Sequence, residues 1–317
     1  MTWAVSLGLT GVLRAQTPAP ASAAPTRLLF IHGRGQGGSD PVKLKQDWID
    51  ALNKGGAAQH QSLPATVQVA FPFYGDVLDR YAAAQRIPLV SDVASRGGEA
   101  PNADYEAFQQ EFAEELREKA GISDAAVQAE LETAPQERGP LNWKWVHAIL
   151  RVLDKNSKWV GQESLEQFTR DVYLYTRLPG VRDDIDALVG AQLTTDPTVV
   201  VAHSLGTIVA YSILKTDRRV LQIPELVTLG SPLGVRAVRD QFRPLRSPAC
   251  IQAWYNAFDT RDVVALYPLD KDNFPISPPI ENNPRVKNFT DNRHGIAGYL
   301  GEATVADRIL SKFGPGH

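Results

Sequence analysis

The chain has 317 residues, of which 43% are hydrophobic and 22% charged, with a formal net charge of −3. This composition is typical of a soluble globular protein, and the length allows one large α/β domain or two small ones. The slightly negative charge gives no general attraction to nucleic acid, and the single cysteine, Cys250, excludes an internal disulfide. The six histidines show no metal-binding spacing, so we expect no metal site.

Residues 1–25 differ from the rest of the chain. An apolar run at residues 3–13 is followed by Ala15 and by a stretch rich in proline and alanine up to residue 25. This order resembles the hydrophobic segment, cleavage site and linker of a secretory signal, and it favours an exported protein over a cytoplasmic one. No lysine or arginine precedes the run, so a loosely docked arm is the alternative. The run is too short for an integral membrane segment.

From residue 26 onward, short β-branched runs alternate with helical periodicity, which is typical of parallel strands joined by crossover helices. The pattern predicts strands at residues 27–31 and 65–71, with a helix at 41–53 between them. From residue 76 to residue 178, helical periodicity dominates. The helices predicted there cover residues 103–119, 122–131, 141–153 and 164–175. A helical block of this length between strands is typical of a cap inserted over the edge of a sheet.

The alternation of strands and helices returns after residue 178. Strands are predicted at residues 198–202, 225–229, 251–258 and 286–289, and helices at 206–215 and 303–313. We therefore predict an α/β fold with a mostly parallel central sheet flanked by helices. Residues 26–75 and 179–317 would form the core, and residues 76–178 the helical cap.

Ser204 lies where a strongly apolar strand meets a helix. The strand reads Thr-Val-Val-Val-Ala, and the turn that follows reads His-Ser-Leu-Gly. A serine on such a turn exposes its hydroxyl at the sheet edge, and the helix N-terminus behind it favours negative charge nearby. Small residues must stand two positions before and after it, and these are Ala202 and Gly206. The pattern predicts a nucleophile, while a serine that only caps an ordinary crossover helix is the alternative.

This turn, in its strand and helix context, resembles the G-x-S-x-G nucleophile elbow of the α/β-hydrolase family, with Ala202 in place of the first glycine. The glycine-rich run that follows the first strand, beginning at His32, resembles the loop that completes the family's oxyanion hole. The resemblance implies that the backbone N–H groups of Leu205 and Arg34 stabilise the oxyanion, with Gly35 as another choice for the second donor.

A nucleotide-binding loop is the competing interpretation of the glycine-rich run. Gly33, Gly35 and Gly38 fit the spacing G-x-G-x-x-G after a strand. However, the next strand ends in Phe71-Pro72 without the acidic residue that would hold a ribose, and the Lys-Ser/Thr ending of a P-loop is absent. We expect His32 to hold the loop backbone rather than to take part in chemistry.

The remaining members of the site follow from the chain order Ser, then Asp or Glu, then His, which the family implies. Two histidines follow Ser204, and of these His317 is the last residue, so His294 is the expected base. Asp262 is the first choice for the acid because it precedes a pair of apolar residues after a strand, and Asp259 is the second choice.

The resemblance implies acyl transfer from a small-molecule ester to water, as in a carboxylesterase or lipase, and this reaction requires neither a metal nor an organic cofactor. Thioesterases, amidases and acyltransferases use the same machinery, and a catalytically silent binding module is the alternative from another class. The joint presence of Ser204, Asp262 and His294 argues against a silent module. Trp143 and Trp145 in the predicted cap are candidates for an acyl pocket, although aromatic residues at helical spacing more often pack inside such a cap.

Overall fold

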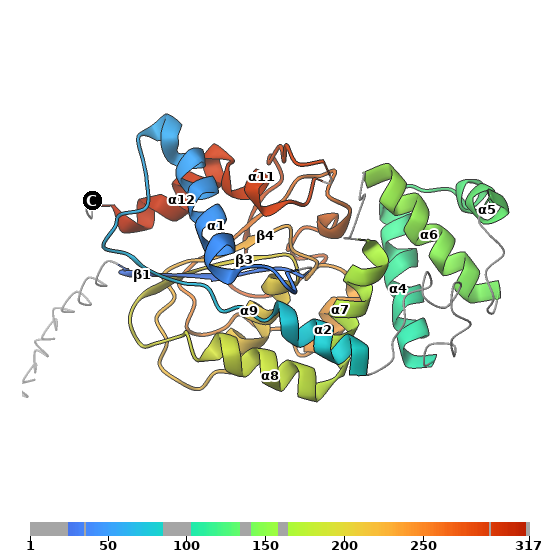
Figure 1. Ribbon diagram of the computed structural model, residues 1–317, viewed down its shortest axis with the longest axis horizontal. Coiled ribbons are helices and arrows are strands. Elements are labelled where there is room, and N and C mark those ends of the chain that lie inside the picture. The colour runs from blue at the N-terminus through green and yellow to red at the C-terminus, as the bar shows by residue number, and fades with distance from the viewer. Residues whose placement is uncertain are drawn as a thin grey trace, which may run out of the picture.

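The computed structural model of the chain has a six-stranded sheet at its centre (Figure 1). It describes residues 25–34, 36–84, 103–133, 141–157, 164–291 and 293–314, so all but the last residue of the predicted N-terminal arm lies outside the described residues. All neighbouring strands are parallel, which confirms the predicted α/β class, and their order is β2-β1-β3-β4-β5-β6. The strands are β1 (Arg27–Ile31), β2 (Gln68–Ala70), β3 (Thr198–His203), β4 (Leu226–Leu229), β5 (Trp254–Ala257) and β6 (Glu281–Asn283).

Helices cover both faces of the sheet because the side chains of its central strands are buried on both sides. In β1, Leu28 and Phe30 join one apolar cluster while Leu29 and Ile31 join the other, as the alternation of side chains along a strand requires. Figure 1 shows three helices on one face, α1 (Pro41–Gly56), α11 (Ile296–Leu300) and α12 (Ala303–Leu310). The opposite face carries α2 (Gly75–Ala84), α8 (Pro179–Gly190) and α9 (Leu205–Thr216).

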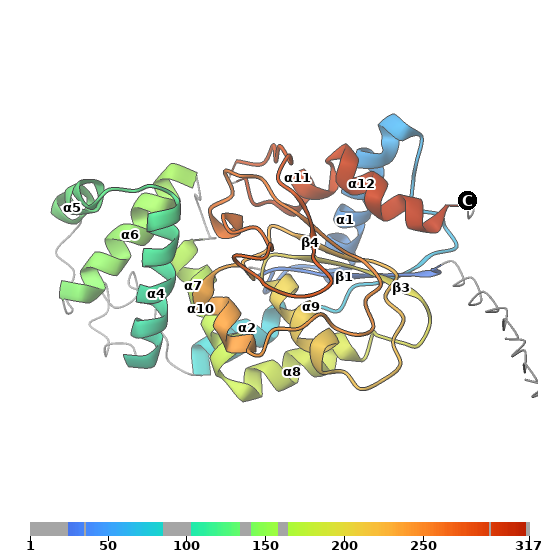
Figure 2. The ribbon, with the colours of Figure 1, turned by 180° about the vertical axis from the view of Figure 1, so that it is seen from behind.

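The remaining long helices form one group, which we call the helical segment: α4 (Ala103–Lys119), α5 (Asp124–Thr133), α6 (Leu141–Ser157) and α7 (Leu165–Arg177). Its members agree with the predicted helices to within a few residues. Figures 1 and 2 show α4, α5 and α6 together beyond one end of the sheet, with α7 between them and the sheet. A capping box starts α7, in which the Ser164 hydroxyl accepts from the Gln167 N–H and the Gln167 amide accepts from the Ser164 N–H.

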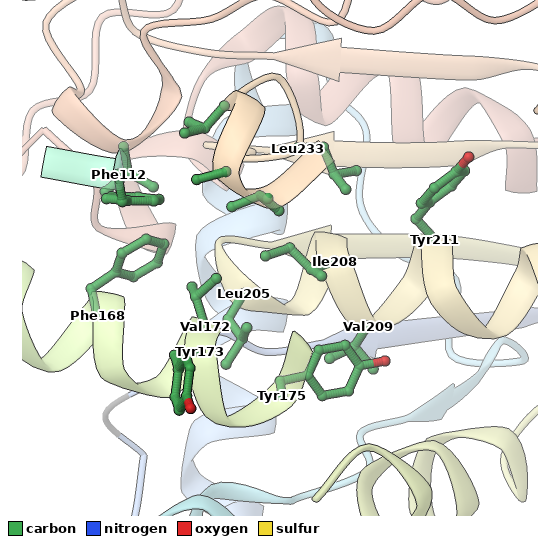
Figure 3. Close-up of a cluster of buried hydrophobic side chains, with 14 of the residues drawn as sticks. Phe112, Phe168, Val172, Tyr173, Tyr175, Leu205, Ile208, Val209, Tyr211 and Leu233 are labelled. Carbon is green, nitrogen blue, oxygen red and sulfur yellow. The ribbon is translucent and has the colours of Figure 1, made fainter. Parts of the chain in front are cut away.

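The helical segment shares a continuous apolar core with α9. Figure 3 shows Phe112 of α4 and Phe168 and Tyr173 of α7 beside Leu205 and Ile208 of α9. All five side chains are at most 2% exposed. Because Leu205 is the residue after Ser204, this core also fixes the start of the helix behind the predicted nucleophile.

Polar contacts join the helical segment to loops at the carboxyl ends of the strands. The Glu115 carboxylate of α4 accepts from the backbone N–H of Arg236 at 2.7 and 2.9 Å, in the connection after β4. Tyr267, which follows β5, donates its hydroxyl to the Glu115 carbonyl at 2.9 Å. After β1, Arg34 forms an ion pair with Asp171 of α7, with 2.9 Å between Nε and Oδ2. The helical segment therefore lies against the carboxyl edge of the sheet.

The last strand differs from the prediction. Residues 286–289 form no strand, and Phe289 in that stretch is 61% exposed; the strand is instead the polar β6. Asparagine has low strand propensity, but two of these side chains find partners that favour their positions. Asn282 Nδ2 donates to the Leu269 carbonyl at 3.0 Å, and Asn283 Nδ2 donates to the Tyr255 hydroxyl at 2.7 Å. The sequence analysis also assigned no separate helices to the residues of α2, α8 and α11.

Candidate active site

The order of the strands places two loops side by side at the carboxyl edge. The sheet order reverses between β1 and β3, and ligands in parallel sheets bind where such a reversal separates neighbouring loops. The glycine-rich loop follows β1 and the turn carrying Ser204 follows β3. A Cβ atom built on Gly33 would lie 2.8 Å from Ser204 Cβ, so the two loops are in direct contact.

The turn at Ser204 has an unusual backbone. Its φ of 56° and ψ of −129° lie in a region that side-chain-bearing residues rarely adopt, and such strain is concentrated at functional sites. The Ser204 N–H donates to the Leu229 carbonyl at 3.0 Å, which ties the turn to β4. At Gly206, a Cβ would lie 2.3 Å from the Ile31 carbonyl oxygen, so a glycine is needed for α9 to approach the end of β1.

Three predicted side chains form one hydrogen-bonded series. His294 Nε2 lies 2.8 Å from Ser204 Oγ, and His294 Nδ1 lies 2.7 Å from Asp262 Oδ2. All three residues are buried. With Asp262 as the acceptor, Nδ1 carries the ring proton and Nε2 is left to accept from the serine hydroxyl.

Asp262 and Asp259 have different surroundings. Asp262 Oδ2 also accepts from the Tyr299 hydroxyl at 2.6 Å, and its Oδ1 accepts from the Val264 N–H at 3.1 Å. Asp259 is instead bound by the Arg261 guanidinium at 2.9 and 2.6 Å. Burial alone would raise the pKa of Asp259, but hydrogen bonds from Arg261 hold it below its ordinary value. The structure therefore places the first-choice acid beside His294 and the second choice in a loop-stabilising ion pair.

The sequence analysis missed Tyr299. It belongs to α11, a helix of five residues that is too short to give a periodic signal. Its hydroxyl donates to Asp262 and accepts from the Asp259 N–H at 3.3 Å, so one buried phenol contacts both aspartates. Burial, together with the nearby Asp262, raises the pKa of Tyr299 well above its ordinary value, which keeps the hydroxyl proton available for Asp262.

His203 positions the loop that carries His294. Its Nε2 donates to the His294 carbonyl at 2.7 Å, and the two rings lie 4.7 Å apart. Burial lowers the pKa of His203 well below its ordinary value, so the ring is neutral. Although adjacent to Ser204 in sequence, the His203 ring contacts the backbone of His294 and not the Ser204 hydroxyl.

His32 orients the glycine-rich loop. Its Nδ1 donates to the Gly33 carbonyl at 2.6 Å, and its Nε2 accepts from the Tyr74 N–H at 3.1 Å. Because a trans peptide directs its C=O and N–H to opposite sides, the Arg34 N–H points away from His32. The Leu205 N–H lies in the first turn of α9, where a helix offers no acceptor. Among the described residues, neither N–H has a protein acceptor, so both are available to an oxyanion.

The buried histidines predict a loss of stability in acid. Burial lowers the pKa of His32 from 6.5 to about 4, so between these values the unfolded chain binds a proton that the folded chain does not. We expect the free energy of unfolding to be highest above pH 6.5 and to fall by about 3 kcal/mol from His32 alone as the pH decreases to 4. Urea unfolding between pH 7 and pH 4 measures this. His32→Gln should reduce the slope, whereas His60→Gln at an exposed position should not; equal slopes in all three proteins would contradict the prediction.

A cavity of about 300 Å³ opens beside Ser204 and His294. Its apolar wall comes from Leu44 and Trp48 of α1 and from Ile296 and Ala297 at the start of α11. No described residue of the helical segment lines it.

The two tryptophan candidates for an acyl pocket have different outcomes. Trp145 donates its indole N–H to Glu114 Oε1 of α4 at 3.0 Å, so it packs inside the helical segment and not in the cavity at Ser204. Its helix, α6, packs against α4, so Trp145 has the packing role that is more common for aromatic residues at helical spacing. The side chain of Trp143 lies outside the described part of the structure.

Neither a metal-binding group nor a membrane-spanning helix occurs in the described parts of the chain. No three His, Cys, Asp or Glu side chains in those parts are grouped so that they could hold a metal ion. Of the helices described, none is both long enough and apolar enough to cross a bilayer.

Comparisons of this chain with models of protein families, with curated proteins and with solved structures gave no match. The class of protein is therefore defined by its fold and geometry alone. It is an α/β protein with a parallel sheet, whose carboxyl edge brings Ser204, His294 and Asp262 together and leaves Asp259 in a separate ion pair.

Proposed function

We propose that this chain is a serine hydrolase of the α/β-hydrolase type that cleaves carboxylic esters. The observation that carries the proposal is the hydrogen-bonded series from Asp262 through His294 to Ser204, with distances of 2.7 and 2.8 Å. A hydroxyl within reach of a base that a third group orients is the general signature of an activated nucleophile. Its position at the sheet reversal, on a strained strand-to-helix turn, adds independent support.

In the first half of the reaction, Ser204 Oγ attacks the ester carbonyl carbon while His294 Nε2 takes the hydroxyl proton. Asp262 accepts from His294 Nδ1 throughout, which keeps the ring in the correct tautomer and stabilises the imidazolium. The backbone N–H groups of Arg34 and Leu205 donate to the oxyanion. His294 then gives its proton to the departing alcohol oxygen, and the carbon–oxygen bond of the ester breaks.

In the second half, water attacks the acyl-enzyme, and His294 removes the proton from that water. The tetrahedral intermediate collapses, the acid leaves and Ser204 regains its proton. The helical segment acts as the cap in this proposal. Phe168 of α7 faces the ring of His294 edge-on, with 6.4 Å between the ring centroids, so the cap covers one side of the base and limits the entry of bulk water.

A fluorophosphonate probe tests the proposal because it reacts with activated serines. We expect the wild-type protein to be labelled and Ser204→Ala to be unlabelled, with hydrolysis of 4-nitrophenyl acetate lower by at least about 10⁴-fold. Ser231→Ala is the matched control. Ser231 is also buried at the carboxyl end of a strand, but its hydroxyl contacts Thr207 at 2.8 Å and not a histidine, so labelling should persist. An unlabelled wild-type protein, or a label lost in Ser231→Ala but kept in Ser204→Ala, would refute the proposal.

A further inference from the structure

The cavity beside Ser204 is lined by α1 and the start of α11, and by none of the residues that the structure describes in the helical segment. We propose that this cavity binds the apolar part of the substrate and that it accepts an uncharged group of about ten non-hydrogen atoms. The identity of that substrate as an ester rests on the function proposed above, whereas the binding of an apolar group to the cavity does not. Side chains of α1 would then select the substrate, whereas the sequence led us to expect this role for the cap.

The wall of the cavity is apolar and rigid. Trp48 is only 4% exposed, and its ring packs edge-on against Phe30 and Phe71, with centroids at 5.1 and 5.4 Å. Leu44, one helical turn before Trp48 on α1, extends the same wall and is half-buried. A preformed apolar cavity of this kind needs little rearrangement to bind an apolar group.

The charges at the cavity are already paired. The Arg34 guanidinium donates from Nε to Asp171 Oδ2 at 2.9 Å and from Nη2 to the Gln167 amide oxygen at 3.3 Å, while its Nη1 has no hydrogen-bond partner among the described residues but is buried away from solvent. Asp47 at the rim is paired with Lys43 at 2.6 Å. An anionic group entering the cavity would lose its hydration without gaining a cation, and this cost selects against it.

The volume sets the size of the group. At roughly 30 Å³ for each water-sized group, a cavity of about 300 Å³ holds about ten non-hydrogen atoms. An acyl or alcohol chain of six to eight carbons is of this size. Each methylene that is buried contributes about fourfold to binding, so chain length should have a measurable effect.

The first arm of the test uses hydrolysis. Leu44→Trp fills the cavity, and we expect it to lower the ratio of kcat/KM for 4-nitrophenyl octanoate to that for the acetate by at least about tenfold. A parallel series of ethyl to octyl acetates shows whether the cavity holds the acyl or the alcohol part. Val42→Trp is the matched control because it adds the same indole to α1 at a side chain that is 71% exposed. Trp145→Phe in the helical segment is the second control, and neither control should change the ratio.

The second arm measures binding without chemistry. Saturation-transfer NMR should detect 1-octanol on the wild-type protein and on Val42→Trp, with at least about tenfold weaker binding to Leu44→Trp. An additional ester tests the charge: the mono-4-nitrophenyl ester of octanedioic acid should react at least about tenfold more slowly than the octanoate. Equal rates for these two esters would overturn the selection against charge.

The two arms separate this proposal from the proposed function. If 1-octanol binds as expected but no ester is hydrolysed, the cavity proposal stands and the hydrolase proposal fails. If esters are hydrolysed but Leu44→Trp changes neither chain-length series nor the binding of 1-octanol, the cavity proposal fails and the hydrolase proposal stands. If Trp145→Phe changes the ratio of kcat/KM for the octanoate to that for the acetate, the helical segment selects the substrate. This result would also overturn the cavity proposal.

Discussion

Replacing Asp262 with asparagine is expected to lower kcat for ester hydrolysis by about 10⁴-fold. The carboxylate accepts from His294 Nδ1 at 2.7 Å and so fixes the ring proton on that nitrogen. An amide can present an N–H there instead, in which case Nδ1 becomes the acceptor and Nε2 carries the proton. Ser204 then has no base to take its proton, although its surroundings are unchanged. Steady-state kinetics with 4-nitrophenyl acetate measures the loss.

Asp259→Asn is the matched comparison, since this aspartate lies three residues earlier and is equally buried. Its carboxylate binds Arg261 and accepts from the Asn288 N–H at 2.9 Å, but it does not contact His294. We expect a loss of about 2 kcal/mol in the free energy of unfolding, from weaker charge-assisted hydrogen bonds, and a small change in kcat. A large loss of kcat in Asp259→Asn with little effect in Asp262→Asn would reverse the two assignments.

Most of the fold could be predicted because its signals are local. The buried strands β1 and β3 are continuous apolar runs, and α4 follows helical periodicity over its predicted range. The candidate site could be predicted for another reason: the Ser204 turn has a recognisable pattern, and the chain order then restricts the choice of base and acid. The strand β6 could not be predicted, because its asparagines are favoured by side-chain partners from other elements.

The features that escaped prediction depend on contacts between distant parts of the chain. The Tyr299 hydroxyl reaches Asp262 only because α11 folds back beside the loop after β5. The ion pair between Arg34 and Asp171 spans 137 residues, and no local pattern indicates it.

The same ion pair predicts a loss of both stability and turnover in Asp171→Ala. Arg34 is 9% exposed and Asp171 is 3% exposed, and removing one member of a buried pair leaves an uncompensated charge. We expect a loss of about 3 to 5 kcal/mol in the free energy of unfolding, measured in urea. We also expect kcat to fall by about 100-fold with little change in KM, because the proposed oxyanion donor is the backbone N–H of Arg34 itself.

A double variant separates the two effects. Arg34→Met combined with Asp171→Leu replaces the pair with apolar side chains of similar size, so most of the stability should return. The glycine-rich loop is then held to α7 by an apolar contact instead of a directed hydrogen bond at 2.9 Å. Because an apolar contact does not fix the direction of the loop, kcat should stay low. If kcat recovers together with stability, the ion pair holds the fold but does not position the oxyanion donor. If kcat stays low in a protein of normal stability, the position of the Arg34 N–H depends on the contact of its own side chain with α7.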